Sequence, residues 1–170
     1  MLHLIGQSAL SAFRIDKVQA LISAEQLPGQ VVGTHFHYLV DHGTSLTDQD
    51  VARLETLLIA TSNASEPGEA IHKWHVTPRF GTQSPWSSKA TDIAQLCGLS
   101  TVRRIERAVA YKFKFQRSLS ERERVALKSL IHDRMVETVS ETSWRSSSCS
   151  SNYPQGRSKK SPCFSWDAMP

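Results

Sequence analysis

The run TPRFGTQSPWSSKATD, residues 77–92, gathers the side chains of this chain that are best suited to chemistry. A helix expected over 89–97 would begin at Ser87 or Ser88, with Lys89 in its first turn. The free amides of a helix N-terminus, together with hydroxyls and an ammonium group, can bind phosphate or another anion. The residues that we expect to contact an anion, or to line an interface or channel, are Arg79, Trp86, Ser87, Ser88, Lys89 and Asp92.

The same run also has a purely structural interpretation. A proline and a glycine turn the chain away from an expected strand, and Pro85 holds Ser84 in an extended conformation. Ser87 would then serve only as the N-cap of the helix, and Trp86 would fill the gap between two halves of the fold. Neither interpretation assigns a catalytic residue.

Three histidines suggest a metal site. His35 and His37 alternate along an expected strand, with His42 nearby, so two imidazoles on one face could bind a metal ion. No third ligand stands at a useful spacing, and edge-strand histidines are common. We therefore assign no metal site.

Cys97 is the candidate nucleophile of the helix 89–97. It stands at the C-terminal end of that helix, where the helix dipole disfavours a thiolate. We expect a buried structural thiol there, followed by Gly98 as the left-handed C-terminal cap.

Two segments that could position these residues have the sequence pattern of a capped helix. LTDQDVARLETLL and LSERERVALKSLI each place an acid three residues after a hydroxyl, Asp50 after Thr47 and Glu123 after Ser120. Each continues with apolar residues at the i, i+3, i+4 spacing of an amphipathic helix. Thr47 and Ser120 are 73 residues apart, and this offset holds throughout both segments.

A second match extends this correspondence upstream. SALSAFRID aligns with SPWSSKATD at an offset of 76 residues, and each precedes a β-branched or aromatic run, VVGTHFHYLV or VRRIERAVAYKFKF. In the second run, alternate residues from Ile105 to Phe115 share one face, as in a strand. We predict an α+β fold of two pseudo-repeated β-α-β-α units, about 1–66 and 67–139, with their sheets side by side or face to face. Chance agreement of common helix-start signals is the alternative.

The composition changes near residue 140. Residues 140–170 contain ten serines in 31 positions and no sustained periodicity. Such a segment buries too little apolar surface to offset its chain entropy, so we expect it to be disordered. It interrupts HDRMVETV, which we expect to be helical, and a frameshifted or otherwise unnatural C-terminus is one explanation.

Charge and cysteine usage narrow the class of protein. The net charge is +4, no stretch has the roughly 18 to 20 apolar residues of a membrane span, and no secretory pattern opens the chain. Three cysteines without a regular framework favour reduced thiols and the cytoplasm. Residues 103–128 carry nine basic and three acidic side chains, so a small basic RNA-binding module is the alternative function. Most of these basic residues fall opposite the aromatic face, which instead indicates a core-facing strand with a solvated back.

The motif around Ser87 also carries a resemblance. VTPRFGTQSPWSSKATDIAQLCGL, with VRRIERAVAY downstream, resembles the N-terminal domain of the large single-chain phosphoribosylformylglycinamidine synthases of purine biosynthesis. SALSAFRIDKV and LIHDRMVETV resemble the same family in the same order, so the resemblance spans roughly residues 1–139. In that family the domain resembles a fused dimer of the small subunit of split enzymes, which agrees with the duplication.

The resemblance implies a part in a larger ATP-dependent carbon–nitrogen ligase. Family members use ATP and magnesium to convert formylglycinamide ribonucleotide and glutamine to formylglycinamidine ribonucleotide, glutamate, ADP and phosphate. Their synthetase and glutaminase domains would be the partners of this domain, which would have no cofactor and no turnover of its own. We expect a truncated or frameshifted product, because the similarity ends near Val139. Ala108 also departs from the family, which usually has glycine there; a positive φ at that position would cost about 1 kcal/mol.

Overall fold

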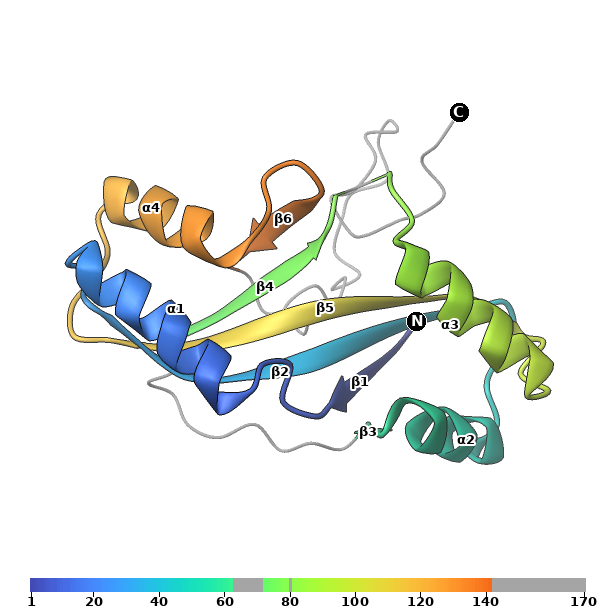
Figure 1. Ribbon diagram of the computed structural model, residues 1–170. Coiled ribbons are helices and arrows are strands. Elements are labelled where there is room, and N and C mark those ends of the chain that lie inside the picture. The colour runs from blue at the N-terminus through green and yellow to red at the C-terminus, as the bar shows by residue number, and fades with distance from the viewer. Residues whose placement is uncertain (63–71, 80, 142–170) are drawn as a thin grey trace, which may run out of the picture.

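The computed structural model of this protein describes residues 1–62, 72–79 and 81–141. These residues form four helices and one six-stranded antiparallel sheet, so the predicted α+β class is confirmed (Figure 1). In chain order the elements are β1 (Leu2–Gly6), α1 (Ala12–Ala24), β2 (Gly29–His42), α2 (Asp48–Leu58), β3 (Ala60–Thr61), β4 (His72–Pro78), α3 (Pro85–Leu96), β5 (Val102–Phe115), α4 (Glu121–Ile131) and β6 (Glu137–Ser140).

The strand order is β3-β1-β2-β5-β4-β6. It reads the same from either edge when β1, β2 and β3 are exchanged for β4, β5 and β6. This is the order expected of two related halves lying side by side, whose common origin stays a prediction. The predicted β-α-β-α unit is too short, however, because the short edge strands β3 and β6 extend each half to five elements.

The two central strands join the halves. β2 and β5 each contain 14 residues and pair from Gly29 opposite Phe115 to His42 opposite Val102. On its other edge β5 pairs with β4 only over residues 109–113. The described part of the chain therefore has no strand against that edge of β5 from Val102 to Ala108.

Local capping starts two of the helices where the sequence predicts. Thr47 accepts from the amide of Asp50, whose carboxylate accepts from the amide of Thr47, and Ser120 and Glu123 repeat the arrangement before α4. Both capping boxes are confirmed. Gly98 has φ +88° after α3, which confirms the predicted left-handed cap.

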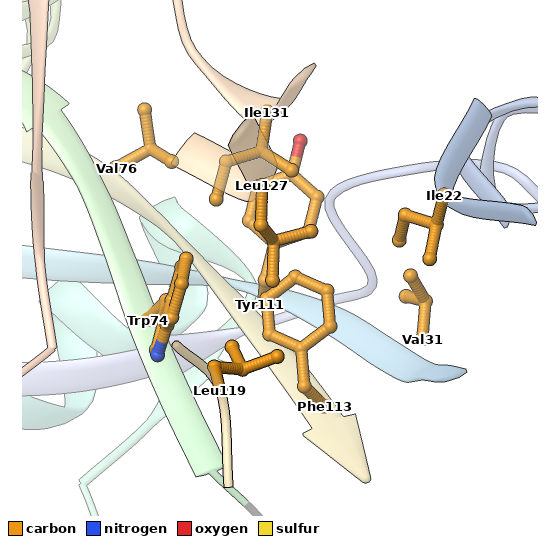
Figure 2. Packing of buried hydrophobic residues seen from close by; sticks show 9 residues of the cluster. All are labelled: Ile22, Val31, Trp74, Val76, Tyr111, Phe113, Leu119, Leu127 and Ile131. Carbon is orange, nitrogen blue, oxygen red and sulfur yellow. The ribbon is translucent and has the colours of Figure 1, made fainter. Parts of the chain in front are cut away.

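Two hydrophobic clusters lie on one face of the sheet, beneath the helices. The first lies under α1 and α4 and consists of Ile22, Val31, Trp74, Val76, Tyr111, Phe113, Leu119, Leu127 and Ile131 (Figure 2). The second lies under α2 and α3 and consists of Leu4, Tyr38, Val40, Leu54, Ala94, Leu99, Val102 and Ile105. Each cluster therefore contains one helix from each half.

The opposite face of the sheet is not the solvated back that the sequence predicts. Ala108, Ala110, His37 and His75 are each at most 2% exposed. Alternation correctly identified the faces of β5, but small and polar side chains can also be buried when their strand is central. Ala108 lies in regular strand pairing opposite His37, outside the positive-φ residues, so the backbone penalty considered for it does not arise.

Three predictions about helices are wrong. HDRMVETV does not continue α4: the helix ends at Ile131, and Glu137–Ser140 instead forms β6 against β4. Cys97 follows α3 as an exposed residue and is not a buried thiol. The spacing of Ile93, Ala94 and Cys97 also predicts that Ile93 faces the core, but its side chain is 42% exposed.

Residues 140 and 141, beyond the predicted boundary at residue 139, also pack on the domain. Ser140 belongs to β6, and the carboxylate of Glu141 forms ion pairs with Arg124 and Lys128 of α4. The predicted disorder of the tail lies outside the described residues from 142 onward. In the described part of the chain, none of the helices has the length and hydropathy needed to cross a membrane.

We predict that Leu127→Ala destabilises the domain strongly, because Leu127 is fully buried in the first cluster. Loss of a buried leucine side chain typically costs about 2 to 5 kcal/mol. Val125→Ala, on the exposed face of the same helix, is the matched control and should cost far less. Urea unfolding followed by circular dichroism measures both, and equal costs would contradict this packing.

Candidate functional site

Helix α3 lies along the edge of β5 that β4 leaves open (Figure 1). Ser87 Oγ donates to the carbonyl of Ile105 at 2.6 Å, and the amide of Ile105 donates to Thr91 Oγ1 at 2.9 Å. One turn further, Gln95 Nε2 donates to the carbonyl of Val102 at 3.0 Å. Ser87, Thr91 and Gln95 are spaced four residues apart and share a helix face. Their side chains take the place of a missing strand, because buried backbone groups need partners.

The helix begins earlier than the sequence predicts. Ser84, and not Ser87 or Ser88, is its N-cap, with Ser84 Oγ accepting from the amide of Ser87 at 3.0 Å. Pro85 then occupies the first turn, where its missing N–H costs nothing and its fixed φ suits a helix. The predicted start at 89 was wrong because the proline belongs to the helix and does not precede it.

A carboxylate already lies beside the N-cap of α3. Glu106 is 3% exposed, and its carboxylate accepts from Ser84 Oγ and from Arg104 Nη2, each at 2.8 Å. Arg104 Nη2 also donates to the carbonyl of Thr82 at 2.8 Å, which fastens the loop before the helix. The protein therefore supplies its own anion at the place where the sequence suggests an external one.

The predicted site residues point in different directions. The hydroxyl of Ser87 is buried against β5, whereas Ser88, Lys89 and Asp92 are exposed on the outer surface of α3. Arg79 lies in the preceding loop, where its amide donates to the carbonyl of Val136 at 3.0 Å. Ser87 thus has a structural role, and Arg79, Lys89 and Asp92 are not gathered around it.

Trp86 belongs to an aromatic group that the sequence did not reveal. Its ring stacks on Tyr38 with centroids 5.7 Å apart. The guanidinium of Arg107 lies over the Trp86 ring at 4.7 Å and over the Phe36 ring at 4.6 Å, measured from Cζ to each centroid. Gly6 leaves the space for this group, since a Cβ there would lie 2.6 Å from Tyr38 Cε2. We call Phe36, Tyr38, Trp86 and Arg107 the Arg107 platform.

An apolar groove adjoins the platform between α2 and α3. Its volume is about 270 Å³, and it is lined by Leu57, Leu58, Trp86, Lys89, Ala90 and Ile93. Trp86 thus belongs to the wall of the groove and to the platform. The prediction that Trp86 fills the gap between the halves agrees with its stacking on Tyr38 of the first half.

The fold and this motif can be compared with known families. The model of the family described as "Formylglycinamide ribonucleotide amidotransferase N-terminal" matches residues 35–148, more than half of the chain. The chain belongs to this family. The match begins within β2 and continues through α3 and β6, so it includes Ser87, Thr91 and the N-cap of α3.

Sequence reasoning missed several residues of this formylglycinamide ribonucleotide amidotransferase N-terminal domain. Thr91 and Gln95 could have been found from their four-residue spacing after Ser87. Arg107 could have been found as the one charged residue among the alternate positions from Ile105 to Phe115. Glu106 gave no such signal, because its partners are brought to it by the loop before α3.

His37 lies in a cluster with His3 and His75, whereas the sequence suggested a group of His35, His37 and His42. His37 lies beside His3 of β1, with His3 Nε2 and His37 Nδ1 2.9 Å apart, and its ring lies 5.1 Å from that of His75 on β4. His42 is at the strand end, with Nδ1 2.8 Å from the carbonyl oxygen of Thr44. Within the described ranges, no three or more His, Cys, Asp and Glu side chains are placed to hold a metal ion.

Burial dominates the electrostatics of this cluster. Burial, and after it the neighbouring His75 and His3, lower the pKa of His37 from 6.5 to about 2. Burial, followed by the charge of Lys112 on β5, also lowers the pKa of His35. The hydrogen bond between His3 and His37 requires a donor on one ring and an acceptor on the other, so the accepting ring must be neutral.

We predict that Ser87→Ala destabilises the domain and Ser88→Ala does not. Removing the buried hydroxyl leaves the Ile105 carbonyl without its partner, at a cost of about 1 to 3 kcal/mol. Ser88 is exposed on the next position of the same helix, so its change should stay within about 0.5 kcal/mol. Urea unfolding of both variants measures the difference, and a larger loss for Ser88→Ala would refute the assignment.

We also predict that mild acid destabilises the domain through His37. Because its folded pKa is lowered, the unfolded chain takes up a proton as the pH falls below 6.5 while the folded chain does not. Between pH 7 and pH 5 this single uptake removes about 2 kcal/mol of stability. Unfolding free energies across this range should fall less steeply for His37→Gln than for wild type and His42→Gln. Parallel curves for wild type and His37→Gln would contradict the prediction.

Proposed function

We propose that this chain acts as the non-catalytic N-terminal domain of a cytoplasmic phosphoribosylformylglycinamidine synthase. Its partners would be the synthetase and glutaminase domains of that ligase. Family membership supports this role. One structural observation supports the proposal that the domain is non-catalytic. The motif side chains best suited to catalysis, the hydroxyls of Ser87 and Thr91, are buried and committed to the backbone of β5.

One contact argues against an ATP phosphate at the candidate anion site of this domain. The start of α3 already adjoins the carboxylate of Glu106, which would repel a phosphate. We therefore assign ATP and magnesium, and the amidation of formylglycinamide ribonucleotide that they support, to the partner domains.

The alternative of a small RNA-binding module loses its main argument. That hypothesis used Tyr111, Phe113 and Phe115, interleaved with the basic residues, as stacking surfaces for bases. Tyr111 is 7% exposed and Phe113 is fully buried, and both lie in the first hydrophobic cluster, against which the partly buried Phe115 packs. The aromatic residues that would read RNA are therefore part of the core.

We predict that this chain restores glutamine-dependent amidation to a synthetase–glutaminase protein from the same family that lacks this domain. The restored rate should exceed that of the deleted enzyme by about tenfold or more, the scale of coupling through a docked domain. The chain alone should show no turnover of formylglycinamide ribonucleotide. Leu54→Asp, which places a charge in the second cluster, is the non-folding control. Turnover by the chain alone, or no response of the deleted enzyme, would refute the proposed function.

A further inference from the structure

Arg107 carries a charge that the fold does not neutralise. It lies on the helix-covered face of the sheet, opposite Tyr38 in the pairing of β5 with β2, and is partly buried. Within the described residues its guanidinium makes no hydrogen bond or ion pair; only its backbone amide donates, to Glu106 Oε1 at 3.1 Å. Arg104 and Arg117, by contrast, each pair with a glutamate.

The platform fixes the guanidinium in place without using its donors. Phe36 and Trp86 hold it through their ring faces at 4.6 and 4.7 Å. Cation–π contacts leave the in-plane N–H groups free, and those groups match the two oxygens of a carboxylate. A guanidinium that is already held in position loses less side-chain entropy when it forms a bidentate pair.

We propose that Arg107 binds a carboxylate side chain of a polypeptide that docks across the Arg107 platform and the α2/α3 groove. The inference rests on the proposed function, in which that polypeptide is the synthetase–glutaminase part of the enzyme. The platform and the groove share Trp86, so a single segment can place an apolar side chain against Leu57 and Ile93 and an acidic one on Arg107. Exposed Lys89 in the groove wall adds a second positive charge.

Charge argues against the chain's own C-terminus as the occupant. Residues 142–170 contain four basic side chains, Arg145, Arg157, Lys159 and Lys160, and one acidic side chain, Asp167. A basic segment does not complement Arg107 and Lys89. An acidic segment of a different polypeptide does.

The test is calorimetric titration of the whole chain with the synthetase–glutaminase protein that lacks this domain. Arg107→Lys keeps the charge but loses the planar fork, and Arg107→Gln loses the charge. We expect each to weaken binding about tenfold or more, as for a buried charged contact at an interface. Arg122→Lys, at an exposed position on α4 outside the platform and the groove lining, should bind within about twofold of wild type. Thermal unfolding of each variant separates a loss of binding from a loss of folding.

A second titration distinguishes the sources of the oxyanion. The Nε–Hε NMR signal of Arg107 is followed while inorganic phosphate or N-acetylglutamate is added to the wild-type chain. Weak, unsaturated shifts with both are expected if the carboxylate needs its docked polypeptide. Saturation by phosphate at submillimolar concentration would overturn the proposal in favour of a free phosphate ligand.

The outcomes separate the two proposals. If the wild-type chain does not bind the synthetase–glutaminase protein, the proposed function fails, and this inference fails with it. If wild type binds and both Arg107 variants bind equally well, only the carboxylate contact is wrong. Self-association of the wild-type chain that the Arg107 variants abolish would assign the surface to a second copy and would also overturn it.

Discussion

The open edge of β5 is the constraint on which much of this structure depends. β5 pairs with β2 over its whole length but with β4 only over residues 109–113. Its backbone groups near Ile105 would be buried without partners if nothing replaced the missing strand, and such groups cost roughly 1 to 3 kcal/mol each. The hydroxyls of Ser87 and Thr91 meet this need from one helix.

This constraint explains why so many specialised residues stand between β4 and α3. Ser84 must cap the helix, and Pro85 must begin it, so that the hydroxyls of Ser87 and Thr91 lie opposite the backbone groups of Ile105. Glu106 and Arg104 then bind the loop that leads into the cap. A motif that looks like an anion site in sequence is, for the most part, the attachment of a helix to a sheet. The proposed docking surface lies beside it, at the Arg107 platform and the α2/α3 groove.

The two halves of the chain depend on each other for their cores. α1 packs in the same cluster as α4, and α2 in the same cluster as α3, so neither half encloses its own apolar residues. The paired strands β2 and β5 contribute residues to both clusters. The two halves therefore form one interdependent unit, and the face of the sheet away from the helices buries His37 and His75.

The sequence by itself determined the features that depend on near neighbours along the chain. Thr47 and Ser120 start their helices through bonds to a residue three positions on, and the alternation of β5 separates its two faces. Only the tertiary structure decided that Ser84 and not Ser87 is the cap, because Ser87 is drawn to Ile105, 18 residues away. The same holds for β6, whose residues have helical periodicity but pair with β4, and for Arg107, whose aromatic contacts come from two other elements. Contacts between distant segments override local propensity wherever they bury apolar surface or satisfy backbone groups that the local structure leaves unpaired.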